Sequence, residues 1–449
     1  MISPQEIGLP PKFVCWQKGQ EKIITSMTYP QHRYNTLSIP TGGGKTVCYI
    51  ASALLSRKRT LILTSTKGLQ DQIGREFGSM VTVMKGQSAY KCKLSDNRYF
   101  CNTGSCHWGY KCPYKPISGT VGKDDKNLCN YHVALRSARK ANIVVTNYSF
   151  WMSNNQDILG SFQLLIMDEA HDAAGHLLDM LSMEVKKDEV SGILSWVPSG
   201  QSATNYYEWA RVLRGRVEDV IEKSGGHEKR GRYSILSLQQ KLQLLSKTWA
   251  SNWVVEHKGN SISWDAIWPA QLAQSYLFRN IPRVLLTSAT VTKADLIMLG
   301  VKEGESTFEE YPSNIPVENR PIYFIPTVRM DRSITTAGMN AWAMRIDNIV
   351  GARLGYKGLI HTVSYKRADR VCNFSQYKDF MMSHQGKTTA ETIVRYKELD
   401  PPCVLVSPSI ITGYDFPRED ARYQIIGKVP FPDSRALVMK ARQKVNPDY

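Results

Sequence analysis

A glycine-rich turn between a short apolar run and a helical pattern constrains the fold of this chain more than any other feature. The turn, Pro40–Thr46 (PTGGGKT), follows the run YNTLSI and precedes KTVCYIASALLS. Glycines allow successive backbone N–H groups to converge on phosphates, and the N-terminus of the following helix adds the positive end of its dipole. A strand, a glycine turn and a helix in this order predict a nucleotide-binding α/β domain.

The individual residues of the turn have expected roles. Lys45 would contact the β- and γ-phosphates of ATP, and the hydroxyl of Thr46 would ligate Mg²⁺. Ile39 occupies the first position of the GxxxxGK[ST] pattern, so PTGGGKT is a shorter version of that loop. The residues of the turn expected to bind ATP are Thr41, Gly42, Gly43, Gly44, Lys45 and Thr46.

A second motif supplies the carboxylates that a nucleotide site needs. The apolar run Leu164–Met167 delivers Asp168-Glu169-Ala170-His171 (DEAH) at its end, and α/β sheets bind ligands at the carboxyl ends of their strands. Asp168 would hold Mg²⁺, and Glu169 would orient and deprotonate the attacking water. The predicted catalytic residues are Lys45, Asp168, Glu169 and His171.

Other short apolar runs predict a largely parallel α/β architecture. They are rich in Val, Ile and Leu and alternate with helical patterns, as buried parallel strands do. The runs are Thr36–Ile39, Thr60–Thr64, Ile143–Thr146, Leu164–Met167, Val284–Thr287, Gly358–His361 and Cys403–Ser407. Two stretches interrupt this rhythm: 82–140, which is rich in cysteine, and 175–280, which is predicted to be mostly helical. Six of the ten tryptophans lie in the second stretch, where helical spacing favours core packing over base stacking.

Charge and length limit the partners and the location of the chain. Lys and Arg number 57 against 40 acidic residues, which gives a formal net charge of +17 and favours a polyanionic partner such as nucleic acid. The 449 residues predict two to four domains. Because no apolar stretch is long enough to span a bilayer and no secretory signal is recognisable, we expect an intracellular, reducing environment.

The cysteine content then points to a metal site. Five of the nine cysteines lie in one window, with the spacing C-x8-C-x4-C-x5-C-x16-C. In a reducing compartment such a cluster indicates metal rather than disulfides. Zinc suits the C-x4-C spacing, whereas an iron–sulfur cluster needs four thiolates and tolerates wider spacings. The five cysteines are Cys92, Cys101, Cys106, Cys112 and Cys129.

Taken together, the motifs resemble those of superfamily 2 helicases. PTGGGKT, DEAH and Ser288-Ala289-Thr290 stand in that order, and Leu61–Gln72 (LILTSTKGLQDQ) looks like the superfamily's DNA-contacting segment. Lys357–Ala368 (KGLIHTVSYKRA) and Val404–Pro417 (VLVSPSIITGYDFP) look like motifs of a second motor domain. The last segment is similar to the XPD/DinG branch, the iron–sulfur helicases.

This resemblance implies an α/β fold with two RecA-like P-loop motor domains. A small cysteine-rich cluster domain and a helical arch-like insertion would both belong to the first. The expected boundaries are 1–81, 141–174 and 281–295 for motor domain 1, 82–140 for the cluster domain, 175–280 for the arch and 296–449 for motor domain 2.

The resemblance also implies roles for single residues. Ser288 and Thr290 would couple hydrolysis to domain movement, and Gln17 or Gln20 would contact the adenine base, with Gln17 preferred. The residues expected to line the cleft facing nucleotide and DNA in the second motor domain are Thr412, Gly413 and Asp415.

For the cysteine window, the resemblance favours a [4Fe-4S] cluster over zinc. Lys85–Cys92 (KGQSAYKC) is similar to the segment that carries the family's first cluster ligand, and Cys129–Phe150 resembles the segment with the last one. The expected ligands are Cys92, Cys106, Cys112 and Cys129, with Cys101 as the alternate.

The function implied is an ATP-dependent DNA helicase that acts on single-stranded and forked DNA, travels 5′ to 3′ and serves repair or replication. Two alternatives remain: a translocase that does not separate strands, and an ATP-gated nucleic-acid clamp with little turnover. The family's last motif, Gln-x-x-Gly-Arg-x-x-Arg, supplies arginine fingers and is not found before Tyr449. We therefore expect the sequence to be truncated before that motif.

Overall fold

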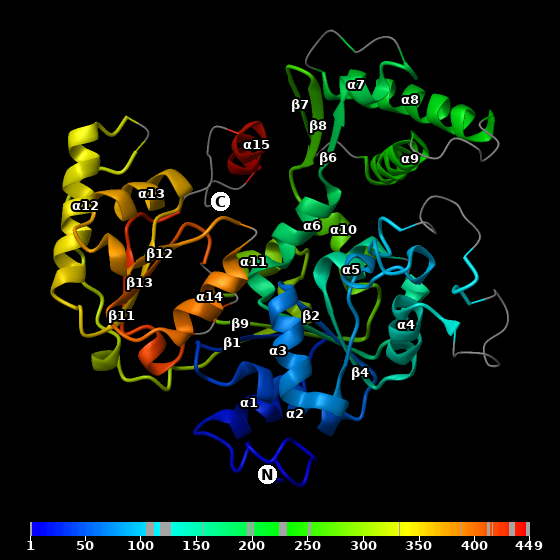
Figure 1. The fold of residues 1–449 in the computed structure, drawn as a ribbon. Coiled ribbons are helices and arrows are strands. Elements are labelled where there is room, and N and C mark those ends of the chain that lie inside the picture. Colours follow the sequence, from blue (N-terminus) through cyan, green and yellow to red (C-terminus); the bar gives the residue numbers. More distant parts are fainter. Residues whose placement is uncertain are drawn as a thin grey trace. The chain divides into compact units, whose positions relative to one another are not determined.

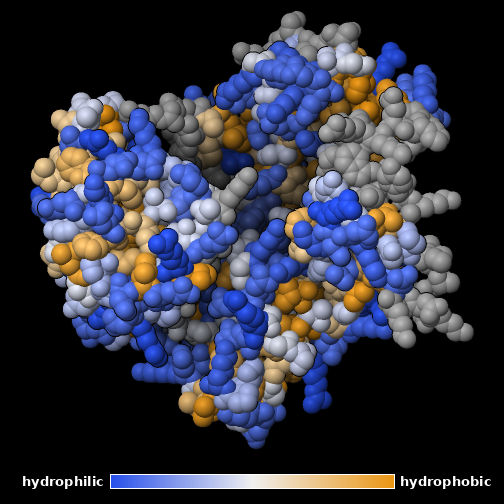
Figure 2. All heavy atoms as spheres, viewed as in Figure 1, coloured by the Kyte–Doolittle hydropathy of each residue, from blue (hydrophilic) through white to orange (hydrophobic). Residues whose placement is uncertain are grey.

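The computed structural model of the chain describes two compact units. The first comprises Met1–Pro316 with Ser434–Tyr449, and the second comprises Val317–Asp433. The described residues are 2–104, 112–116, 127–154, 156–194, 198, 202–223, 231–249, 253–331, 333–386, 388–410, 414, 416–430 and 436–445. Hydrophilic side chains cover most of the face shown in Figure 2. Among the described residues, no helix is both long and apolar enough to cross a membrane.

A seven-stranded parallel sheet forms the centre of the first unit (Figure 1). Its strand order is β10-β1-β9-β5-β2-β4-β3. The strands are β1 (Tyr34–Ser38), β2 (Thr60–Thr64), β3 (Thr82–Val83), β4 (Ile143–Asn147), β5 (Leu164–Asp168), β9 (Arg283–Ser288) and β10 (Ser306–Glu310). Every residue of β2 and β5 is buried, which explains why these strands are recognisable as uninterrupted apolar runs.

Helices cover both faces of this sheet. Ile62 and Ile166 pack into the core beneath α1, α2 and α3, whereas Leu61 and Leu165 point to the opposite core, as alternation along a strand requires. On that opposite face lie α4, α5 and α6. The helices are α1 (Gln20–Thr28), α2 (Lys45–Ser56), α3 (Lys67–Phe77), α4 (Asn130–Lys140), α5 (Tyr148–Ser153), α6 (Ala173–Leu181) and α11 (Lys293–Met298).

The insertion between β5 and β9 is not purely helical, so the expectation of a helical arch is incomplete. It contains two long helices and a three-stranded antiparallel sheet in the order β6-β8-β7. Strand β8 alternates buried and partly buried residues, and its Trp264 stacks on Trp209 with 6.2 Å between ring centroids. The elements are β6 (Met183–Lys186), α7 (Lys187–Val190), α8 (Ala203–Lys223), α9 (Gly231–Thr248), β7 (Trp253–Lys258), β8 (Ser261–Ala266) and α10 (Ala270–Ala273).

Helix α15 (Leu437–Val445) also belongs to the first unit. Its Arg442 donates hydrogen bonds of 3.0 Å to the carbonyls of Ala266 and Ile267, so the helix is held at the end of β8.

The second unit is built on a four-stranded parallel sheet in the order β12-β13-β11-β14. Its elements are α12 (Thr336–Gly351), β11 (Lys357–His361), α13 (Tyr365–Phe374), β12 (Met381–Ser383), α14 (Thr389–Glu398), β13 (Cys403–Ser407) and β14 (Tyr423–Ile426). The unit begins at Val317, not at residue 296 as the sequence suggested, because β10 pairs in parallel with β1 and keeps the intervening residues in the first unit.

Candidate nucleotide-binding site

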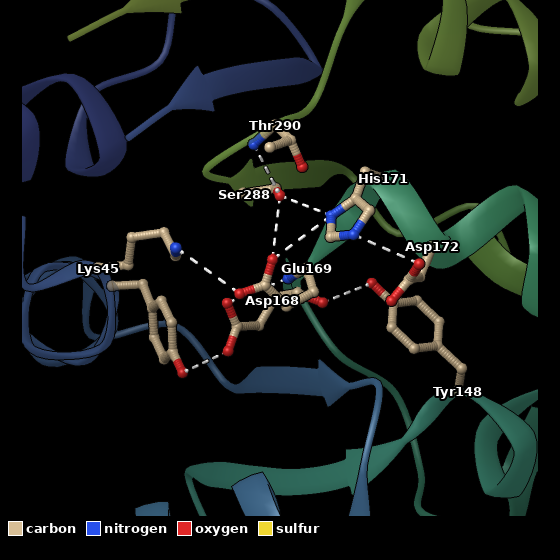
Figure 3. Close-up of polar contacts among 9 residues, drawn as sticks. Lys45, Tyr148, Asp168, Glu169, His171, Asp172, Ser288 and Thr290 are labelled. Atoms are coloured by element: carbon tan, nitrogen blue, oxygen red, sulfur yellow. Dashed lines mark hydrogen bonds and ion pairs between the residues drawn. The ribbon is translucent and has the colours of Figure 1, made fainter. Parts of the chain in front are cut away.

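Three motifs meet at the carboxyl edge of the first sheet. Strands β1, β9 and β5 are neighbours in the sheet. At their carboxyl ends, β1 leads into Pro40–Thr46, β9 into Ser288–Thr290 and β5 into Asp168–His171. The register places Ser38 beside Ser288 and Asp168 beside Thr287. Parallel strands therefore bring the phosphate loop, the paired carboxylates and the serine motif to one place (Figure 3).

The glycine turn requires its glycines and is supported from below by Gln20. Gly42 and Gly44 have φ values of +81° and +71°, which lie in the left-handed region that favours glycine. A Cβ on Gly44 would also collide with the amide of Gln20. That buried side chain donates to the carbonyl of Gly43 at 3.4 Å and accepts from the amide of Gln17 at 2.9 Å. Gln20 thus stabilises the loop, while Gln17 stays exposed.

Asp168 is buried and held by two tyrosines that the sequence analysis did not single out. Its Oδ2 accepts a hydrogen bond of 3.2 Å from the hydroxyl of Tyr49, and its carbonyl accepts one of 3.0 Å from the hydroxyl of Tyr148. Burial raises the pKa of Asp168 to about 6, the neighbouring Glu169 carboxylate adds to the rise, and Lys45 opposes it. Tyr49 also contacts Thr46, so one phenol lies between the two side chains expected to bind Mg²⁺.

Glu169 has the surroundings expected of a carboxylate next to a γ-phosphate. Its backbone adopts a φ of +49°, an uncommon value for a residue other than glycine that often marks a functional site. One carboxylate oxygen lies 3.6 Å from Nζ of Lys45, and the other accepts a hydrogen bond of 3.0 Å from the hydroxyl of Ser288. Both Lys45 and Glu169 are partly exposed, so a phosphate can reach the space beside them.

Ser288 is the centre of a second set of contacts. Its Oγ lies 2.7 Å from Nδ1 of His171 and accepts a hydrogen bond of 3.2 Å from the amide of Thr290. The other ring nitrogen of His171 lies 3.3 Å from a carboxylate oxygen of Asp172. The imidazole therefore connects the DEAH segment to the serine motif at the end of β9 (Figure 3).

The expected residues of the second unit cannot be placed in this site. Thr412, Gly413 and Asp415 lie outside the described residues. The residues of the first unit expected to bind nucleotide or to act in catalysis, in the glycine turn and in Asp168–His171, are all described.

Four of the five cysteines of the window line one cavity of about 50 Å³ in the first unit. Cys92, Cys101 and Cys129 are buried and Cys112 is partly buried, whereas Cys106 lies outside the described residues. No described cysteine forms a disulfide. The cavity therefore contains Cys101, which the sequence analysis held only as an alternate ligand.

Thiolates are ligands of both zinc and iron–sulfur clusters, and the four cysteines that line this cavity are chemically suited to either. Within the described residues, no three Cys, His, Asp or Glu side chains converge closely enough to hold one metal ion. Four sulfurs at about 2.3 Å from one zinc ion would have to lie close together, whereas a cluster places iron atoms between them.

Comparisons with known proteins agree with the fold and the order of the motifs. Residues 15–194 match the family model described as the type III restriction enzyme, res subunit. The solved structure of an XPD helicase has a TM-score of 0.57 at 13% identity and covers 95% of this chain and 87% of that one. Xpd4 of S. tokodaii has a TM-score of 0.57 at 12% identity, with coverages of 96% and 88%. No curated protein matches the chain.

The family model covers the glycine turn and the DEAH segment, and the XPD structures cover nearly the whole chain. Together with the parallel sheets, these matches support a fold made of RecA-like domains. The chain therefore has the fold of the XPD helicase structures that it matches.

Proposed function

We propose that this chain is an ATP-driven motor that moves along single-stranded DNA and separates the strands of forked DNA. The observation that carries this proposal is the position of Glu169 between Lys45 and Ser288. A carboxylate beside the phosphate-binding lysine can orient and deprotonate a water for attack on the γ-phosphate. The serine and His171 then sense the presence or absence of that phosphate.

Asp168 and Thr46 are the residues that would bind the Mg²⁺ ion. Both lie next to Tyr49, and Asp168 is the last residue of β5, at the carboxyl edge of the sheet. A divalent ion held there would neutralise charge on the β- and γ-phosphates during transfer. Glu169 and Lys45 would act on the same phosphate from the protein side.

Charge and fold support DNA as the track. A formal net charge of +17 favours a polyphosphate partner, and contacts to the backbone would give little sequence specificity. The resemblance to the XPD branch supports travel from 5′ to 3′ and a role in repair or replication inside the cell. Opening a base-pair step costs about 1.4 kcal/mol on average, which is well within the range of one ATP-driven step.

A [4Fe-4S] cluster, rather than zinc, completes the proposal. Cys92, Cys101, Cys112 and Cys129 would hold it, with Cys106 as the spare cysteine. Few described residues of the window other than α4 form regular structure, so four thiolate bonds would fix its fold. The cluster would thereby make this window a rigid part of the motor.

The first test is ATP hydrolysis by the whole 449-residue chain with and without single-stranded DNA. We expect strong stimulation by DNA, weaker stimulation by RNA of the same sequence, and loss of hydrolysis in Glu169→Gln. Glu208→Gln is the matched control, because Glu208 is an exposed carboxylate on α8 that pairs only with Arg211 at the surface. DNA binding without stimulated hydrolysis would contradict the motor and support an ATP-gated clamp.

Strand separation needs its own measurement. Two duplexes are compared, one with a single-stranded 5′ tail and one with a single-stranded 3′ tail. Only the duplex with the 5′ tail should be separated. Hydrolysis that is stimulated by DNA but never displaces a strand from either substrate would contradict the helicase and leave a translocase.

A further inference from the structure

A buried histidine and a buried serine meet at the carboxyl end of β13 in the second unit. His384 follows β12 and is 5% exposed, and Ser407 is the last residue of β13 and is 2% exposed. Nε2 of the imidazole lies 2.8 Å from Oγ of Ser407. Nδ1 lies 2.9 Å from Oγ1 of Thr389, the first residue of α14. The histidine therefore joins two strands and a helix at one point.

The hydrogen bonds at this point can be assigned in one consistent direction. The hydroxyl of Thr389 donates to the carbonyl of Gly386 at 3.2 Å, so it accepts from Nδ1 of His384. Nε2 is then the acceptor for the hydroxyl of Ser407. The oxygen of the same hydroxyl accepts hydrogen bonds of 3.1 and 2.9 Å from the backbone amides of Ser409 and Ile410, respectively. With a neutral imidazole, every polar atom in the chain of contacts is satisfied.

The same construction occurs in the first unit. Ser288 is the last residue of β9, its Oγ contacts the imidazole of His171, and it accepts the amide of Thr290, two residues further on. Ser407 accepts the amide of Ser409, also two residues further on. The two serines differ in the acceptor of their hydroxyl proton. The hydroxyl of Ser288 donates a hydrogen bond to the carboxylate of Glu169, whereas the hydroxyl of Ser407 donates one to the imidazole of His384.

We propose that His384, acting through Ser407, is a positioning residue that sets the course of the chain leaving β13. This inference rests on the proposed function, because the segment that follows Ile410 carries the residues expected to face the nucleotide. The imidazole fixes the rotamer of the Ser407 hydroxyl, and that hydroxyl fixes two successive amides. Loss of the imidazole leaves the hydroxyl free to rotate and the backbone of residues 409 and 410 less constrained.

The contact can be removed without dismantling the unit. Ile410 is buried in a small core with Leu359, Tyr396 and Leu405, so apolar packing keeps the segment attached. The imidazole edge also faces the ring of Tyr365, with 6.3 Å between centroids. A phenyl ring in place of the imidazole would preserve this contact while removing both hydrogen bonds.

The test compares the steady-state kinetics of DNA-stimulated ATP hydrolysis in the full chain. His384→Phe and Ser407→Ala should each lower kcat roughly tenfold, because small misplacements of a reacting assembly have large effects on rate. The KM for ATP should change by less than about twofold, since the phosphate loop belongs to the first unit. His384→Gln, whose amide can accept from Ser407, should recover most of the lost kcat. The double variant that combines His384→Phe with Ser407→Ala should have a kcat no lower than that of Ser407→Ala alone.

Ser375→Ala is the matched control. Its hydroxyl is also buried, lies in the same unit and bonds to the carboxylate of Asp347, away from the end of β13. We expect a wild-type kcat from this variant. If His384→Phe fails to fold, Ser407→Ala decides alone.

A wild-type kcat in Ser407→Ala would overturn the role of His384, whatever happens to thermal stability. Failure of the proposed function looks different: hydrolysis would then be insensitive to DNA and to Glu169→Gln in the unmodified background, and both proposals would fall together.

Discussion

The phenol of Tyr49 donates a 3.2 Å hydrogen bond to Oδ2 of Asp168. Tyr49 lies on α2, one turn after Lys45, whereas Asp168 ends β5. The same tyrosine contacts Thr46. One buried side chain therefore fixes the spacing between the helix that follows the phosphate loop and the strand that delivers the carboxylates.

Tyr49→Phe should weaken the response to Mg²⁺. The hydrogen bond from Tyr49 lowers the pKa of Asp168, so its loss would raise that pKa further and disfavour the ionised, metal-binding form. We expect the Mg²⁺ concentration for half-maximal ATP hydrolysis to rise roughly fivefold. A hydrogen bond to a charged group contributes about 1.5–3 kcal/mol, which would allow a larger change than this. Tyr206→Phe, which removes a hydroxyl bonded to His257 in the insertion, is the control. An unchanged Mg²⁺ requirement in Tyr49→Phe would contradict the assignment.

Asp168→Asn should stabilise the ligand-free protein at neutral pH while abolishing hydrolysis. Burial raises the folded-state pKa of Asp168 from an ordinary value of 3.8 to about 6. The protonated carboxyl therefore favours folding below pH 4, and this contribution is lost as the pH rises through about 6. The shift corresponds to a difference on the order of 2–3 kcal/mol in the free energy of unfolding at pH 7.

The measurement for this prediction is thermal unfolding in EDTA between pH 4 and pH 8. The unfolding temperatures of wild type and Asp168→Asn should coincide near pH 4 and separate as the pH rises. Asp219→Asn, which changes an exposed carboxylate on α8, should show a pH-independent difference from wild type. A flat difference for Asp168→Asn as well would mean that its carboxyl has an ordinary pKa.

The central strands could be predicted from the sequence because helices cover both of their faces. Under that condition every position of β2 and β13 is buried and most are apolar, and the two predicted runs match the observed strands residue for residue. Strand β10 could not be predicted in this way. It lies at the edge of the sheet, ends in two glutamates and is only partly buried, so its place depends on pairing with β1, far away in the sequence.

In the candidate site, too, features set by local sequence could be predicted, whereas features that depend on distant contacts could not. The phosphate loop and the carboxylate pair are local motifs, and a local pattern of residues is enough to assign them. Tyr49 could not be assigned, because an aromatic residue on an apolar helix is usually core and its partner, Asp168, lies 119 residues further along the chain. Cysteine spacing likewise could not show that Cys101 shares a cavity with Cys92, Cys112 and Cys129, because that proximity comes from the fold.

Ser288→Ala should uncouple strand separation from hydrolysis. The hydroxyl of Ser288 bridges Glu169, His171 and the amide of Thr290, so its loss cuts the connection between the catalytic carboxylate and the chain after β9. We expect kcat to fall roughly tenfold and the number of strands separated per ATP to fall further. In the control Ser306→Ala, the lost hydroxyl bonds only to nearby carbonyls. A wild-type ratio of separation to hydrolysis in Ser288→Ala would refute the coupling role.

Substitution of single cysteines should identify the four cluster ligands. Cys92, Cys101, Cys112 and Cys129 line the same cavity, so serine at any one of them should reduce the iron content and the visible absorbance of the purified chain. Cys106→Ser should retain both. The reason is that four thiolates complete the ligand set of a cluster, and these four cysteines line one cavity.

The control for this series is Cys372→Ser, which changes a partly buried cysteine of the second unit and should leave the iron content at the wild-type level. Iron and zinc are measured together in each purified variant, before any ATP assay, so that cluster binding is scored independently of activity. Iron that survives Cys101→Ser but is lost in Cys106→Ser would reverse the ligand assignment. Stoichiometric zinc in the wild type would contradict the cluster and identify a zinc site bound by the same thiolates.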